Sequence, residues 1–192
     1  MNLFGLSLFR HLEAFLIYIT TANKKDAAIL FTALVIPGPI KFFFIFILAM
    51  RLLPATISGR DIKLLLSLPF SRSEIFIYSF LFGFSLIFFA TTIDRALFGR
   101  SGSPDFLNCF IFYAFYFGIM TVNALKIGKI MIIPMLILAF DLLSSFIAPG
   151  VYDFVSQYSP LYQQNQPLSL LAALAVLVIS FLLFVFGRRE RW

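Results

Sequence analysis

Residues 168–186, LSLLAALAVLVISFLLFVF, form an apolar run without a single charged side chain. A helix needs about 20 apolar residues to cross the roughly 30 Å core of a bilayer, and this run has that length. Three further runs, each with at most one charged side chain, have the same character: 75–93, 106–123 and 130–148. We therefore predict an all-α fold, that of a polytopic integral membrane protein.

The composition of the whole chain agrees with this prediction. It is 61% hydrophobic and 12% charged, whereas an average soluble domain has about 25% charged residues. The net charge of +6 is spread over the ends of the apolar runs, which favours contact with membrane lipids. No basic run is present, so we expect no nucleic-acid partner.

The sequence offers little for catalysis. Cys109 and His11 are the only residues of their types, so neither a disulfide framework, a metal site nor a serine triad is expected, and Cys109 fits inert packing within an apolar span. Gly128 and Lys129 lack the upstream glycine and the following hydroxyl of a phosphate-binding loop. We predict a non-enzyme with no catalytic residues, no metal and no cofactor bound by this chain.

The first third of the chain is less regular. Residues 27–53 form one apolar run that is interrupted at residues 37–39, Pro-Gly-Pro, and at Lys41. Two crossings would need about 40 residues, so we expect one kinked or partly unwound span whose proline region faces other helices. Residues 3–21 have apolar side chains at helical spacing, interrupted by charge, and they fit either a sixth span or an interfacial helix.

Basic residues predict the orientation, because lysine and arginine gather in short cytoplasmic loops. Three arginines in the last five residues place the C-terminus inside. Counting back over the spans places Lys126 and Lys129 inside, the loop with Arg95 and Arg100 outside, and residues 54–73 inside. If residues 3–21 also span, the chain is a single six-helix domain over 1–192 in the cell membrane, with both termini cytoplasmic.

The longest charge-bearing interruption of the apolar pattern is residues 54–73, PATISGRDIKLLLSLPFSRS. Ser58 and Asp61 have the spacing of a capping pair and predict a short helix that Pro69 stops after Leu68. The predicted helix is amphipathic, with an apolar face and a basic remainder, and is long enough for two to three turns along the membrane surface. The apolar face is made by Ile62, Leu65 and Leu66, and the basic remainder by Arg60 and Lys63.

A second helix start follows directly. Ser71 is a good N-cap, Glu74 stands at the third helical position to reach back to it, and Phe70 with Ile75 can form a hydrophobic staple. These signals predict a rigid start for span 75–93. A displacement of the short helix would then be transmitted to the span.

Residues 64–75, LLLSLPFSRSEI, resemble the segment between the second and third transmembrane helices of type 2 ABC exporter permeases, which commonly reads like LLLSLPVSRREI. The match covers about a dozen positions, and elsewhere only hydropathy and the six-span layout agree. The resemblance implies a coupling helix that docks in a groove of a separate ATP-binding subunit, in an assembly of two permease chains and two ATPases. ATP and Mg are then expected in the partner ATPase.

The coupling residues that the resemblance implies are Arg60, Asp61, Ile62, Lys63, Leu65, Leu66, Pro69, Ser71, Arg72 and Glu74. The chain departs from the family pattern just before the leucine run. Family members often have Gly-Thr-Leu-Glu there, whereas this chain has Lys63 at the familiar acidic position. Which charges meet the ATPase therefore stays open, as does pairing with an identical or a paralogous permease.

Asp141 lies near the middle of span 130–148, where a carboxylate costs a few kcal/mol unless it finds a partner. Asp141 either lines a substrate path with Ser144 and Ser145, or hydrogen-bonds these serines and stabilises the bundle. The Tyr- and Gln-rich stretch 149–167 fits an aromatic belt slightly better than the re-entrant outer segment that the resembled family often has.

The favoured interpretation is thus a permease subunit of an ATP-driven exporter. The alternative is an ATP-independent membrane protein, either an accessory or assembly subunit or a small secondary carrier. A carrier is expected to show inverted repeats and an ionisable group near the midplane. No internal repeat is visible, and Asp141 is the one firm midplane candidate.

Overall fold

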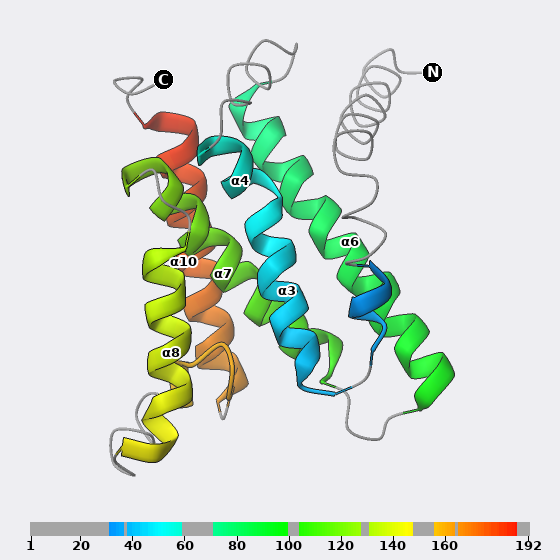
Figure 1. Ribbon diagram of the computed structural model, residues 1–192. Coiled ribbons are helices and arrows are strands. Elements are labelled where there is room, and N and C mark those ends of the chain that lie inside the picture. Colours follow the sequence, from blue (N-terminus) through cyan, green and yellow to red (C-terminus); the bar gives the residue numbers. More distant parts are fainter. Residues whose placement is uncertain are drawn as a thin grey trace, which may run out of the picture.

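The computed structural model describes residues 31–36, 38–58, 71–99, 104–127, 131–147, 156–163 and 165–187. Within these ranges the fold is all-helical, with no strand (Figure 1). The main helices are α3 (Ile40–Arg51), α4 (Leu53–Ser58), α6 (Arg72–Phe98), α7 (Phe106–Ile127), α8 (Ile132–Ile147) and α10 (Gln166–Phe186). The predicted N-terminal segment 3–21 lies outside the described residues, and so do residues 59–70 of the predicted coupling loop.

Three of these helices, α6, α7 and α10, are long and apolar enough to cross a membrane. This confirms the predicted all-helical fold, and the three long apolar helices agree with the membrane class that the apolar runs predict. Helix α8 falls within the predicted span 130–148, but its 16 residues extend only about 24 Å. Helix α6 extends past the predicted end of span 75–93 at residue 93 and stops only at Gly99. Gly99 has φ 71°, in the left-handed region, and donates its N–H to the Arg95 carbonyl.

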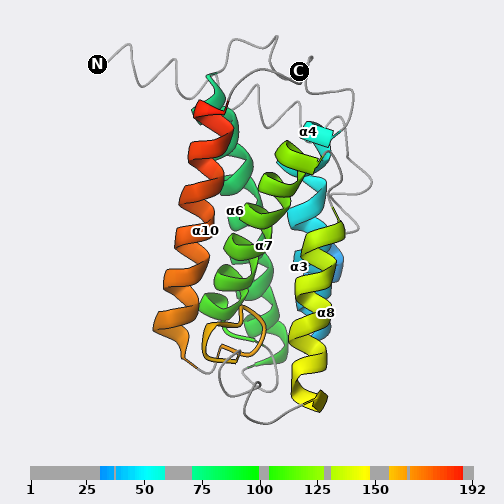
Figure 2. The same ribbon diagram turned by 90° about the vertical axis from the view of Figure 1, so that its left-hand side faces the viewer.

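Helix α7 is the centre of the bundle. It packs against α3, α4, α6, α8 and most extensively α10, and Figures 1 and 2 show it enclosed from two directions. Small residues let the neighbours approach closely: a Cβ on Gly118 would lie 3.2 Å from the backbone of Val176 on α10. Aromatic rings fill the rest of the contact, with Phe76 of α6 lying 5.4 Å from Phe117.

The segment before α6 differs from the prediction at its beginning. Pro54, assigned to the loop 54–73, lies in the first turn of α4, where its missing N–H leaves no helical hydrogen bond unmade. The same proline cannot donate to Met50, so the helix breaks at Leu52 between α3 and α4. Ser58, predicted to begin a new helix, is instead the last residue of α4.

The described part of the Pro-Gly-Pro region is a turn between two helical stretches. Residues 31–34 are helical, Gly38 has φ 98°, and α3 begins at Ile40, while Pro37 lies outside the described residues, so one partly unwound span over 27–53 stays a prediction. Pro39 is exposed and the space around Gly38 is open. The exposed Pro39 stands directly before the first turn of α3, where its missing N–H leaves no helical hydrogen bond unmade, so this proline differs from the expected bundle-facing one.

The two ends of the bundle differ in charge. One end, which we call the basic end, carries Arg51, Arg72 and Lys126, at the upper ends of α3, α6 and α7 in Figure 1. The opposite end, which we call the paired end, carries two ion pairs, Lys41 with Asp94 and Arg95 with Asp105. Among the described residues, basic side chains therefore outnumber acidic ones at the basic end, whereas each of the two ion pairs at the paired end joins one basic and one acidic side chain.

Candidate functional site

The start of α6 has the predicted capping box. The Glu74 backbone N–H donates to Ser71 Oγ at 3.2 Å, and the Ser71 backbone N–H donates to Glu74 Oε2 at 2.7 Å. The Ser71 hydroxyl also donates to Glu74 Oε2 at 2.8 Å. Two backbone donors that a helix start leaves without intrahelical partners are therefore satisfied reciprocally, which confirms the cap inferred from the spacing.

Side-chain contacts attach this helix start to the rest of the bundle. Arg72 Nη1 donates to the carbonyl of Gly187, directly after α10, at 3.3 Å. Ile75 is fully buried, and the ring of Phe76 lies 5.3 Å from Phe181 and 6.0 Å from Phe184 of α10. The residues that follow the leucine-rich segment are thus fixed against α10, and a force on Ser71 would reach both helices.

Loss of the cap is expected to loosen this start locally. Ser71→Ala removes the acceptor for the Glu74 N–H, at a cost of about 1 kcal/mol, which is roughly fivefold faster amide exchange for residues 72–75. Hydrogen exchange with mass spectrometry measures this, with Ser71→Thr as the variant that keeps a hydroxyl. Equal exchange in wild type and Ser71→Ala would show that the cap does not hold the helix start.

The structure brings together only part of the predicted coupling set. Ser71, Arg72 and Glu74 meet at the start of α6, as described above. The remaining members, Arg60, Asp61, Ile62, Lys63, Leu65, Leu66 and Pro69, lie outside the described residues, as does Phe70 of the predicted staple. The structure therefore describes the helix start that follows the predicted short helix, and not the predicted helix itself.

Asp141 has a partner that neither sequence interpretation included. Its carboxylate is 3% exposed and accepts a hydrogen bond of 2.8 Å from Ser159 Oγ. Ser159 Oγ in turn accepts the N–H groups of Leu161 at 3.0 Å and Tyr162 at 3.2 Å. The side chains of Ser144 and Ser145 lie outside the described residues. The carboxylate therefore ties α8 to the segment before α10, which the linear spacing along α8 does not indicate.

That segment, residues 156–163, is held within the bundle by polar contacts. Gln163 Nε2 donates to the carbonyls of Asn108 at 2.9 Å and Pro160 at 2.5 Å, and Ser169 Oγ lies 3.1 Å from the Gln157 carbonyl. Figure 2 shows the segment beside the lower ends of α7, α8 and α10. Ser156 and Ser159 are buried, so residues 156–163 form a segment inserted at this end of the bundle, while the aromatic belt that we favoured for stretch 149–167 stays a prediction.

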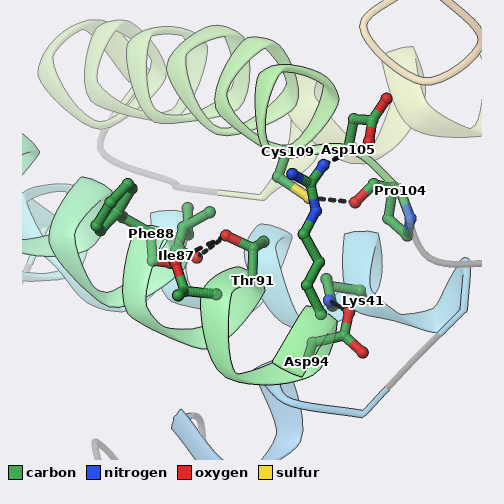
Figure 3. Close-up of polar contacts among 10 residues, drawn as sticks. Lys41, Ile87, Phe88, Thr91, Asp94, Pro104, Asp105 and Cys109 are labelled. Atoms are coloured by element: carbon green, nitrogen blue, oxygen red, sulfur yellow. Dashed lines mark hydrogen bonds and ion pairs between the residues drawn. The ribbon is translucent and has the colours of Figure 1, made fainter. Parts of the chain in front are cut away.

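The sequence interpretation missed a buried ion pair at the paired end. Lys41 Nζ donates to Asp94 Oδ2, and both side chains are 1% exposed (Figure 3). Lys41 was recognised only as an interruption of an apolar run, and Asp94 fell just past the predicted end of a span. Had Gly99 been taken as the stop signal of this helix, the predicted helix would have extended past Asp94. The pairing of Asp94 with Lys41, however, arises only from the tertiary fold.

No protein-family model matches this chain, and no curated protein or solved structure is similar to it. Functional inference therefore rests on the dozen-residue resemblance and on the geometry of the bundle. At the level of class, the described residues form an all-helical protein in which three helices are long and apolar enough to cross a membrane.

Proposed function

We propose that this chain is the transmembrane permease subunit of an ATP-driven ABC transporter, with the direction of an exporter. The observation that carries the proposal is the capping box of Ser71 and Glu74, which begins α6 directly after the leucine-rich string. In the resembled family this position joins the coupling helix to a transmembrane helix. A rigid joint is what such a role requires, because a flexible linker would absorb the displacement.

The mechanism starts at the partner ATPase, which binds ATP and Mg. Closure of the ATPase dimer displaces the amphipathic segment around Arg60 to Leu68, whose apolar face contacts the ATPase groove. The capped start of α6 receives this displacement, and the Arg72 contact to Gly187 passes it to α10. Helices α6 and α10 then move together against α7, on which both pack.

Charge supports the orientation that this mechanism needs. Arg51, Arg72 and Lys126 at the basic end exceed the one acidic residue there among the described residues, Glu74. At the paired end the two basic residues that the structure describes, Lys41 and Arg95, each have an acidic partner. Since lysine and arginine gather on the cytoplasmic side, we infer that the basic end faces the cytoplasm, together with residues 59–70, which follow α4 in the sequence.

This orientation predicts a labelling pattern. In a Cys109→Ala background, a cysteine at Ser103 is expected to react with an impermeant maleimide on intact cells, because it adjoins the paired end outside. A cysteine at Ser67 is expected to react only after the membrane is permeabilised. Labelling of the Ser67 position from outside would place the predicted coupling segment where no ATPase can reach it and would exclude the proposal.

The transport pathway is expected between two permease chains, identical or paralogous. In the resembled family two such chains form the working unit, and a chain of 192 residues has little room for a pathway of its own. The native assembly, purified from membranes in mild detergent, is expected to contain an ATPase with a Walker A motif and a second permease chain. Recovery of the chain without an ATPase would instead favour an accessory subunit or a secondary carrier.

The carrier alternative has one specific observation in its favour, the buried carboxylate of Asp141. Proton-coupled carriers place such a group in the membrane interior. In this structure Asp141 accepts a hydrogen bond from Ser159 and holds the 156–163 segment, which gives the carboxylate a structural partner. Transport that depends on a proton gradient and is abolished by Asp141→Asn would favour the carrier.

A further inference from the structure

The Lys41 and Asp94 pair joins two helices that otherwise touch little. Helix α3 packs mainly against α7 and contacts α6 far less. The two helices run antiparallel, so that the first turn of α3 and the C-terminal part of α6 meet at the paired end (Figure 1). The ion pair is therefore a main link between α3 and α6 at this end.

The pair is poorly suited to stabilising its own helices. Lys41 places a positive charge at the N-terminal end of α3, and Asp94 a negative charge near the C-terminal end of α6, so each opposes its helix dipole. Asp94 Oδ1 is buried and has no hydrogen-bond partner within the described part of the chain. A buried pair with an unsatisfied oxygen can often be replaced by apolar side chains without loss of stability.

Such a pair has two favourable states. When closed and dry, the charges attract strongly across a low dielectric. When apart at the end of the bundle, each charge can be hydrated, whereas a separated pair that stays dry is costly. The turn at Gly38, with φ 98° and open space around it, lies three residues before Lys41 and gives the end of α3 room to move.

Cys109 of α7 lies at the same end of the bundle as this pair. Its thiol is fully buried, Sγ is 3.9 Å from the Pro104 carbonyl, and Figure 3 draws it in one cluster with Lys41, Asp94 and Asp105. Separation of α3 from α6 would therefore open a route from the aqueous side to Cys109.

We propose that the Lys41–Asp94 ion pair is a latch that closes the paired end of the bundle between α3 and α6 and opens reversibly in the folded protein, uncovering Cys109. The inference rests on the ion pair and its surroundings and not on the proposed coupling to an ATPase. It assigns both residues a conformational role.

The test is the rate at which Cys109 reacts with a membrane-impermeant maleimide in the full chain reconstituted in lipid nanodiscs. Cys109 is the chain's only cysteine, so a single site is measured. Asp94→Asn leaves Lys41 without its counter-ion and is expected to raise the rate at least about tenfold. In the double variant Lys41→Met and Asp94→Leu, the two apolar side chains gain nothing from hydration, so this end of the bundle should stay closed. Cys109 is then expected to react at least about tenfold more slowly than in wild type.

The matched control is Asp105→Asn, which breaks the exposed pair with Arg95 at the same end. That pair is 43% and 70% exposed, so the rate should stay within about twofold of wild type. Size-exclusion chromatography before labelling confirms that each variant is folded.

The comparison of wild type with the doubly apolar variant decides the proposal, even if Asp94→Asn does not fold. Equal labelling rates of Cys109 in these two proteins would show that the ion pair stays closed in the folded protein, and would overturn the latch. A doubly apolar variant that fails to fold would show that the charges are needed for folding, which also overturns it.

Discussion

The double variant Leu65→Asp and Leu66→Asp is expected to lose the partner ATPase while the membrane bundle stays intact. Both leucines lie on the predicted apolar face of the short helix, and a buried carboxylate in an ATPase groove would have no partner there. A few central, fully desolvated residues carry most of the binding energy of an interface, and burial of two carboxylates there is costly, so recovery of the ATPase with tagged chain should fall at least about tenfold. Quantitative mass spectrometry of the purified assembly measures this ratio.

The control for this experiment must alter the same segment without touching the apolar face. Ser67→Ala removes a small polar group between the leucines and Pro69, and it is expected to leave recovery unchanged. Ser71→Ala should keep the ATPase bound but weaken the transmission of its motion, so ATP hydrolysis would persist while transport falls. Full recovery and transport in the Leu65 and Leu66 variant would refute the assignment of 54–73 as the coupling segment.

The start of α6 was predictable because all its determinants are local. Ser71 and Glu74 are three residues apart, and the hydrogen bonds between them form within one turn of helix. The apolar runs were predictable for a similar reason, since helix length and hydropathy are properties of a contiguous segment. Local signals were missed where two of them competed, as at Pro54, which ends α3 and also starts α4.

The two buried charge contacts were not predictable, because each joins segments far apart in the sequence. Lys41 and Asp94 are 53 residues apart, and Asp141 and Ser159 are 18 residues apart. A single sequence shows that an intramembrane charge needs a partner, but not which residue supplies it. For Asp141 the sequence indicates Ser144 and Ser145, whose side chains lie outside the described residues, and the fold supplies in addition the hydroxyl of Ser159.

The two ends of the bundle therefore serve different purposes in the proposed mechanism. At the basic end, local capping and the contact of Arg72 with Gly187 make a stiff joint that transmits displacement. At the paired end, long-range charge contacts hold α3 to α6, and a hydroxyl holds the inserted segment to α8. Motion that starts at one end is coupled to the other only if α6 moves as one rigid helix against α7.

That requirement makes Gly83 the position where a single methyl group should have the largest effect on the fold. A Cβ at Gly83 would overlap the Tyr113 hydroxyl, lie 2.6 Å from the Tyr113 ring carbon Cζ, and lie 2.7 Å from Leu52 Cδ1. Tyr113 is fully buried, stacks on Phe80 at 5.2 Å, and donates its hydroxyl to the Phe80 carbonyl at 3.2 Å. The ring therefore cannot withdraw without losing contacts.

Gly83→Ala is expected to destabilise the protein by about 1–3 kcal/mol through overpacking, although alanine alone favours a helix by up to about 1 kcal/mol. The thermal midpoint in detergent, read by fluorescence-detected size exclusion, should fall accordingly. Ser85→Ala, at an exposed position two residues away, should leave the midpoint nearly unchanged.

Adding Tyr113→Leu to Gly83→Ala should recover part of the loss, because the shorter side chain leaves room for the new methyl group. The two substitutions are then expected to couple by at least about 1 kcal/mol in a double-mutant cycle. A Gly83→Ala protein that melts above wild type would mean that helix propensity outweighs contact, and that α6 and α7 are not in close contact at Gly83. In that case α6 would lack the rigid support that transmission along its length requires.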